Sequence, residues 1–167
     1  GLNVRIDIVR PGTYLALERH LQEIQYHYPE GYYHIFHFDG HGSILSIQDL
    51  TAMYKNGSLL VKDRAGRSEI QEYDGKKPFI FLEGEHEGQA DPVEAEELAD
   101  LLKTYRIPVV ILNACQSGML TESNLSNIGT ALMQAGLSTV VAMSYSVTVS
   151  AAKKFMQTLY RTFVEKK

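Results

Sequence analysis

Residues 109–115 read Val-Val-Ile-Leu-Asn-Ala-Cys, a near-continuous apolar run that ends on the only cysteine of the 167-residue chain. Short apolar runs of this kind are typical of strands buried on both faces, so we predict a strand over residues 108–113, with Cys115 just beyond its end. A second such run, residues 33–39, ends two residues before His41-Gly42. A thiol and an imidazole therefore each follow a predicted buried strand.

Further strands are predicted on both sides of these two. Val4, Ile6 and Ile8 alternate with other residues, which predicts a first strand over residues 4–9. Residues 79–82 and 139–143 are short apolar runs and predict two more. Two weaker runs, Leu59-Leu60-Val61 and Glu69-Ile70-Gln71, flank Ala65-Gly66 and predict an inserted hairpin within residues 59–73.

Helices are predicted between the strands from end signals and from periodicity. Thr13 is a candidate N-cap for a helix to about Tyr28. Asp91-Pro92, with Glu94 as a capping-box partner, predicts a helix that starts there and runs to about Tyr105. A third helix is expected over about residues 125–135, closed by Gly136. A last helix carries one apolar stripe, formed by Ala152, Phe155, Met156, Leu159 and Phe163. Apolar strands that alternate with helices favour an α/β fold with a mainly parallel sheet covered on both faces.

Composition narrows the class of protein and its compartment. The net charge is −4, the pI is about 5.9 and the basic residues are scattered, so we expect no direct binding of nucleic acid and no membrane partner. A lone cysteine excludes an intrachain disulfide and favours a cytoplasmic protein. We expect residues 1–167 to form one domain and, since the chain lacks an initial Met and ends on Glu-Lys-Lys in a predicted helix, to be a fragment of a longer chain.

The carboxyl ends of the predicted strands bring candidate catalytic groups to one rim. In open α/β sheets the ligand crevice lies outside these ends, so four loops share the rim: residues 40–43, 83–90, 115–120 and 144–148. If the strands before His41 and Cys115 are close in the sheet, the imidazole can activate the thiol and later protonate a leaving amine. Gly42 lacks a Cβ, and its N–H together with that of Cys115 would form an oxyanion hole, worth about 3 kcal/mol per donor.

At these residues the chain resembles the caspase, gingipain and separase superfamily of cysteine peptidases, and more closely its CHAT-domain branch, often found next to tetratricopeptide repeats. The matching pieces are residues 34–42 (His-Ile-Phe-His-Phe-Asp-Gly-His-Gly), 110–118 (Val-Ile-Leu-Asn-Ala-Cys-Gln-Ser-Gly) and 135–141, with Phe155 and Tyr160 in the last helix.

The resemblance implies a caspase-like three-layer α/β/α sandwich and a cysteine endopeptidase that acts on a protein or peptide substrate. His41 would be the general base, Cys115 the nucleophile and the Gly42 backbone an oxyanion donor. The two catalytic residues are 74 positions apart (115 − 41), against about 50 in caspases, and the inserted hairpin accounts for the difference. Repeats in the same full-length chain, or a regulatory partner, would control activity.

Four residues are candidates for the substrate pocket. Asn113 stands two residues before the nucleophile, where the superfamily often places a pocket side chain. Asp39 precedes His41, and Glu83 and Glu85 belong to an acidic stretch on the predicted rim. The carboxylates leave a basic substrate residue possible, while a solvated charged loop is the simpler interpretation of Glu83 and Glu85.

Other functions fit the residues less well. His34, His37 and His41 repeat at spacings of three and four, but on a strand His34 and His37 fall on opposite faces and no tetrahedral ligand set is completed, so we expect no metal and no other cofactor. The Gly40-His41-Gly42 stretch lacks a P-loop lysine and the dinucleotide glycine spacing. A non-catalytic interaction or scaffold module remains the alternative, in which Cys115 is a small buried residue at a strand end.

Overall fold

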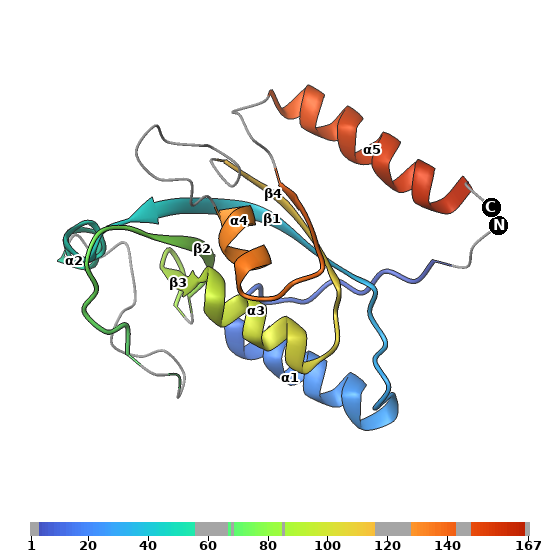
Figure 1. Ribbon diagram of the computed structural model, residues 1–167, viewed down its shortest axis with the longest axis horizontal. Coiled ribbons are helices and arrows are strands. Elements are labelled where there is room, and N and C mark those ends of the chain that lie inside the picture. The colour runs from blue at the N-terminus through green and yellow to red at the C-terminus, as the bar shows by residue number, and fades with distance from the viewer. Residues whose placement is uncertain are drawn as a thin grey trace.

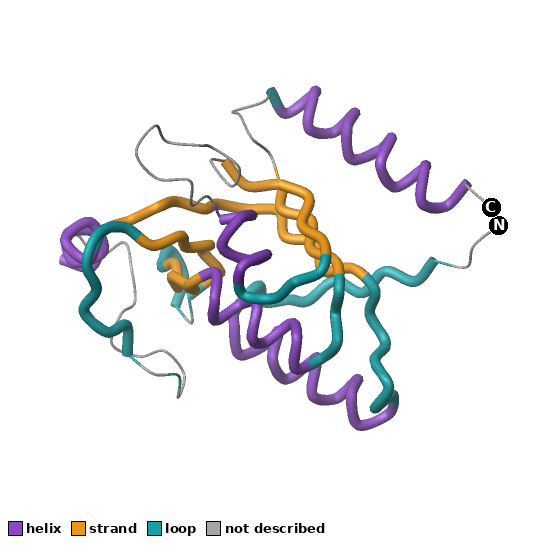
Figure 2. Tube along the Cα trace, in the orientation of Figure 1, coloured by secondary structure: helices purple, strands orange, loops and turns teal. Residues whose placement is uncertain are grey.

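The computed structural model describes residues 4–55, 67, 69–84, 86–115, 128–142 and 148–165. Its helices and strands alternate along much of the chain (Figures 1 and 2). In chain order they are α1 (Tyr14–His27), β1 (Ile35–Leu45), α2 (Ile47–Lys55), β2 (Lys77–Glu83), β3 (Ala90–Glu94), α3 (Ala95–Thr104), β4 (Val109–Cys115), α4 (Ile128–Gln134), β5 (Thr139–Ala142) and α5 (Val149–Glu165).

The described strands form one five-stranded sheet in the order β3-β2-β1-β4-β5. β1 pairs with β4, and β4 with β5, in parallel, whereas β2 is antiparallel to both β1 and β3. The expected α/β class is confirmed, but the sheet is parallel only in part. The antiparallel half arises because β2 and β3 form a hairpin, which reverses the chain without a helical crossover.

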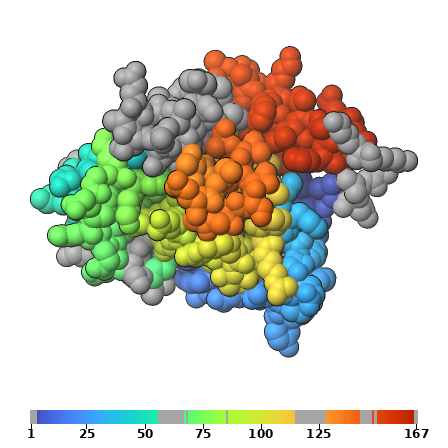
Figure 3. Space-filling model, in the orientation of Figure 1, coloured from blue at the N-terminus to red at the C-terminus, as the bar shows by residue number. Residues whose placement is uncertain are grey.

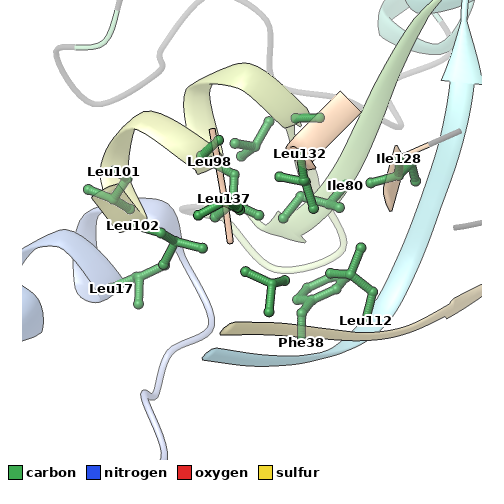
Figure 4. Packing of buried hydrophobic residues seen from close by; sticks show 14 of the residues in the cluster. Leu17, Phe38, Ile80, Leu98, Leu101, Leu102, Leu112, Ile128, Leu132 and Leu137 are labelled. Atoms are coloured by element: carbon green, nitrogen blue, oxygen red, sulfur yellow. The ribbon is translucent and has the colours of Figure 1, made fainter. Parts of the chain in front are cut away.

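Helices cover both faces of this sheet. α1, α3 and α4 lie on one face, which we call the rear face, and α5 lies on the opposite or front face (Figure 1). The rear core joins side chains from all three rear helices to the sheet, as Figure 4 shows; its members include Leu17, Leu21, Leu98, Leu102, Leu132, Ile80 and Leu112. A smaller cluster around Leu50 of α2 and Phe79 of β2 covers the front face at the β2 end. The three-layer arrangement expected from the sequence is therefore present.

Several predicted elements are confirmed. The strands expected over residues 33–39, 79–82, 108–113 and 139–143 correspond to β1, β2, β4 and β5. Thr13 caps α1, since its side-chain oxygen accepts a hydrogen bond from the Ala16 backbone N–H at 3.2 Å. Gly136 follows α4 with φ of 101°, the left-handed conformation that favours glycine after a helix.

The strand predicted over residues 4–9 is wrong. The segment has no strand partner among the described residues, and Val4, Ile6 and Ile8 are 57%, 76% and 75% exposed. It is held by side chains instead: the Tyr33 hydroxyl donates to the Asp7 carboxylate at 2.7 Å, and the Arg5 guanidinium lies over the Tyr32 ring. An alternating pattern indicates an extended chain, but it does not supply a neighbouring strand.

The predicted helix start at Asp91 is also wrong. Residues 90–94 form β3, and α3 begins at Ala95 with Glu94 as an N-cap that makes no side-chain capping bond. The Asp91 carboxylate pairs with Arg67, so it is not free to cap a helix. Pro92 lies in an edge strand, where a missing backbone N–H can face away from the ladder.

The inserted hairpin was expected in the wrong place. Residues 69–73 are not a strand, and residues 59–61 lie outside the described part of the chain. The hairpin is instead formed by β2 and β3, with Glu83 paired to Ala90 at its closed end. One stretch expected to be a rim loop, residues 40–43, is regular structure, because β1 continues to Leu45. Residues 47–55, which follow it, form α2.

The last helix carries its apolar stripe as expected, but the sheet covers only part of it. Ala152 is buried, whereas Phe155 and Phe163 are each 44% exposed. α5 forms one edge of the molecule in the space-filling view (Figure 3). No helix among the described residues has both the length and the apolar character needed to cross a bilayer.

Candidate active site

His41 and Cys115 occupy paired positions on neighbouring strands. They are Cα partners at the end of the parallel ladder between β1 and β4. Neighbouring strands lie about 4.8 Å apart, and paired positions of a parallel ladder share a face of the sheet. The sequence places both residues in loops beyond strand ends, but in the structure His41 lies inside β1 and Cys115 is the last residue of β4.

Burial of the alternating neighbours identifies the face on which these positions lie. Phe38 of β1 and Leu112 and Ala114 of β4 belong to the rear core, and Figure 4 shows Phe38 and Leu112 within it. Since side chains alternate along a strand, positions 41 and 115 belong to the front face. The candidate site is thus on the side of the sheet that carries α5 and not on the side of α1, α3 and α4.

The two glycines beside His41 have a packing role on the rear face. A Cβ at Gly42 would lie 2.5 Å from Cδ1 of Ile128, the first residue of α4, and one at Gly40 would lie 2.6 Å from Cζ of Phe38. Real Cβ atoms do not approach other heavy atoms this closely, so a side chain at either position would require Ile128 or Phe38 to shift. The absence of a side chain at Gly42 is therefore explained by the contact of α4 with the sheet, apart from any role of its N–H.

Asp39 and Asn113 form the next pair along the same ladder. They are Cα partners, and the Asn113 amide donates to Asp39 Oδ1 at 2.9 Å. Both share the front face with position 41 by the alternation of the strands. Two predicted pocket residues are therefore brought together, two pairs before the candidate dyad in the ladder.

The other two predicted pocket residues are not seen there. The Glu83 carboxylate accepts a hydrogen bond from the Gly12 backbone N–H at 2.7 Å, and the Glu83 N–H donates to the Gly12 carbonyl at 3.0 Å. These bonds attach the chain before α1 to the end of β2. Glu85 lies outside the described residues, as do the rim residues 116–120 and 144–147.

His37 links the front face to the last helix. Its Nδ1 lies 2.7 Å from the Tyr160 hydroxyl of α5, and the two rings stack with centroids 5.6 Å apart. Burial lowers the pKa of His37 below its ordinary value, opposed by the negative charge of Asp39, and burial raises the pKa of Tyr160. The hydrogen-bond partner of this strand residue thus comes from a helix.

The histidine spacing does not produce a metal site in the part of the chain that is described. No group of three or more His, Cys, Asp and Glu side chains there could hold a metal ion. The three histidines have different settings. His34 precedes β1, so it does not lie on the strand as expected; His37 binds Tyr160, and His41 lies four residues further along the ladder from His37.

One neighbour of His41 could not be identified from the sequence. Phe81 of β2 is the Cα partner of His41 in the antiparallel ladder. The apolar run over residues 79–82 predicted a strand, but only the extension of β1 past its expected end reveals which residue of that strand faces His41.

The comparisons with known proteins agree with this fold. A model of the CHAT domain family matches residues 3–167, which is nearly the whole chain. The chain therefore belongs to the CHAT domain family, the caspase-like domains related to separases and gingipains. No curated protein and no solved structure matches the chain significantly.

Proposed function

We propose that this domain is a cysteine endopeptidase that cleaves protein substrates with a Cys115–His41 dyad. One observation carries the proposal: the only thiol in the sequence and an imidazole hold paired positions on adjacent parallel strands, on one face of the sheet. Membership of a caspase-like, peptidase-related family supports it. At this separation a thiol and an imidazole are within reach of a direct proton transfer.

The chemistry needs four proton transfers at His41, two in each half of the reaction. The imidazole takes the proton of the Cys115 thiol, and the thiolate adds to the carbonyl carbon of the scissile peptide. The imidazolium then protonates the leaving amine as the C–N bond breaks, which leaves a thioester. His41 next takes a proton from a water molecule, whose oxygen adds to the thioester carbonyl. The C–S bond then breaks, the carboxylic acid leaves, and the imidazolium returns its proton to the Cys115 thiolate. Both residue types required for each step are in the chain.

The backbone N–H groups of Gly42 and Cys115 would stabilise the oxyanion in both steps. The two residues are adjacent in the ladders, since Gly42 follows His41, the partner of Cys115. Each donor aimed at the developing charge is worth about 3 kcal/mol. The proposal needs these two N–H groups to face the substrate on the front face.

The substrate pocket would be formed by Asp39 and Asn113. Asn113 uses its amide N–H to hold Asp39 Oδ1, and among the described residues Oδ2 has no hydrogen-bond partner. An anchored carboxylate with one available oxygen can accept hydrogen bonds from a basic or amide side chain of the substrate. We therefore propose that the residue before the scissile bond is a hydrogen-bond donor.

Control of the site is proposed to come from flanking repeats or from a partner protein. The incomplete cover of α5 supports this, since Phe155 and Phe163 leave large apolar side chains half exposed. We expect peptide hydrolysis by the 167-residue domain to rise when the longer chain or its partner is present. Equal rates in the two preparations would contradict this control.

Labelling by an electrophilic peptide probe tests the proposal without a known substrate. Wild-type protein should be labelled at Cys115, and both Cys115→Ala and His41→Ala should lose labelling by at least about 10³-fold. His86→Ala, at an exposed histidine of the β2–β3 turn, is the matched control and should label like the wild type. Equal, slow labelling of wild type and His41→Ala would contradict the dyad and favour a non-catalytic interaction module.

A further inference from the structure

His41 is the point at which the two halves of β1 meet. Residues 35–41 of β1 pair in parallel with β4, and residues 41–45 pair in antiparallel with β2. Among the pairs of the described strands, His41 alone belongs to both of these ladders. It is therefore flanked on one side by Cys115 and on the other by Phe81.

Phe81 is held in place by the front cluster beneath α2. It packs, partly buried, against the cluster formed by Leu50 and Phe79. The other partly buried apolar residues packed against the same cluster are Leu45, Ile47, Met53, Ile70, Tyr73 and Ala90. A ring packed in this way has few alternative orientations, so it presents a stable apolar surface beside the next residue of the row.

The two sides of His41 differ in polarity. On the β4 side stands Cys115, and two pairs earlier in the same ladder is the Asp39–Asn113 hydrogen bond. On the β2 side stands Phe81, while the Glu83 carboxylate further along β2 is bonded to Gly12. The described residues form no hydrogen bond to the His41 imidazole. Among the described residues, the His41 ring can therefore be oriented by packing but not by a third polar residue.

We propose that Phe81 is a positioning residue for His41. Its ring occupies the β2 side of the imidazole and so restricts His41 to orientations that face Cys115. Paired positions of an antiparallel ladder have Cβ atoms about 5 Å apart, so the His41 and Phe81 side chains start as neighbours on the front face. The inference rests on the proposed dyad. It adds a side chain, Phe81, that orients His41 as a third polar residue does in a catalytic triad.

The single cysteine allows a direct test in which no substrate is needed. We would measure alkylation of Cys115 by iodoacetamide from about pH 5 to about pH 9. A thiol paired with an imidazole stays reactive at acidic pH, because its thiolate is stabilised by the imidazolium. We expect this acidic reactivity in the wild type and its loss in His41→Ala.

Phe81→Ala should lower the acidic reactivity by about tenfold, part of the 10²- to 10⁴-fold contribution of a well-positioned acid–base group. Phe81→Tyr keeps the ring and should retain the wild-type profile. Phe36→Ala is the matched control: Phe36 is also a partly buried phenylalanine, but it lies on the rear side of β1. Its profile should not change. Phe81→Val, which suits a strand, replaces Phe81→Ala if thermal unfolding shows that the alanine variant is not folded.

Each outcome separates the two proposals. A wild-type profile identical to that of His41→Ala overturns the dyad and, with it, the role of Phe81. A wild-type profile that depends on His41 but is unchanged in folded Phe81→Ala or Phe81→Val overturns the role of Phe81 alone. Loss of acidic reactivity in Phe81→Tyr would also contradict the role of Phe81, because that variant keeps the ring. A loss in Phe36→Ala as large as that in Phe81→Ala would contradict it too, because Phe36 does not lie beside His41.

Discussion

Tyr160 of α5 stacks on His37 of β1 and holds its hydroxyl 2.7 Å from the imidazole Nδ1. The last helix is thereby connected to the strand that carries His41, four residues further along. Among the described side chains of α5, Ala152 is the one that is buried, and Tyr160 is partly buried. This pair is therefore a main attachment of the helix to the front face.

Removal of the hydroxyl should loosen α5. We expect Tyr160→Phe to cost about 1 kcal/mol of unfolding free energy, the usual worth of one hydrogen bond, while the stacked ring is kept. Hydrogen exchange should increase in residues 149–165 more than in α3. Unchanged protection of α5 would show that the helix is held by other contacts.

The same pair predicts a dependence of stability on pH. Burial lowers the pKa of His37 in the folded state, so the unfolded chain binds more protons at mildly acidic pH. At a pH above the ordinary pKa of histidine, His37 is neutral in both states and its contribution to stability is intact. As the pH falls from that ordinary pKa toward the lowered pKa of the folded state, the unfolded chain gains a proton first and this contribution is lost. Urea unfolding should show a steeper acid loss in the wild type than in His37→Gln, and equal slopes would contradict the assignment.

Gly42 offers a test of the contact between α4 and the sheet. Gly42→Ala places a Cβ 2.5 Å from Ile128 Cδ1 and should cost about 1–3 kcal/mol through overpacking. Ile128→Val removes that Cδ1 atom. The double variant should therefore recover part of the loss, measured as a coupling in a double-mutant cycle. Additive losses would show that the clash is relieved in another way.

Arg67 anchors the chain before β2 to the rear helices. Its guanidinium pairs with Asp91 and with Glu97, and lies 4.0 Å from the centre of the Tyr14 ring. Its side chain is 9% exposed, so Arg67→Met should cost about 2–4 kcal/mol by removing a buried cation from two carboxylates.

Arg161→Met is the control for that loss. The Arg161–Glu165 pair is 4.0 Å long and about 70% exposed, and its removal should change the unfolding free energy by less than about 0.5 kcal/mol. Thermal or urea unfolding measures both variants. Similar small losses in the two would mean that the Arg67 network adds little stability.

Asp39 provides a test of substrate preference. Peptides with Arg before the scissile bond should be cleaved faster than those with norleucine, and Asp39→Asn should reduce kcat/KM for the Arg peptides by roughly 10- to 100-fold, the value of a charged hydrogen bond. Peptides with norleucine serve as the internal control and should change little. A parallel loss for both peptides would assign Asp39 to the fold instead of the pocket.

Local signals in the sequence predicted an element correctly where the side chains that define it have one favoured structural role. Thr13 caps α1 because little competes for its hydroxyl, and the apolar run that ends at Cys115 has no alternative to a buried strand. Asp91 shows the opposite case. Its carboxylate is equally suited to a helix cap and to Arg67, and only the fold brings Arg67 within reach.

The candidate site was predictable in its residues but not in its arrangement. The two motifs indicated His41 and Cys115, and the parallel pairing of their strands followed from the α/β pattern. The hairpin that pairs with the second half of β1 could not be read from the sequence, because strand register depends on contacts between distant segments. Phe81 as a neighbour of His41, and Glu83 as a partner of Gly12, follow from that register.

Because β1 is continuous through His41, covalent backbone sets the spacing between that residue and the part of β1 that pairs with the hairpin. A shift of β2 by one residue along β1 would replace Phe81 by a residue of the opposite face and expose its apolar row to water. Length changes should consequently be tolerated in the turn between β2 and β3 and excluded from Gly42 to Leu45. A segment that lies outside the parallel core thus sets a limit on how this domain can diverge without losing its proposed chemistry.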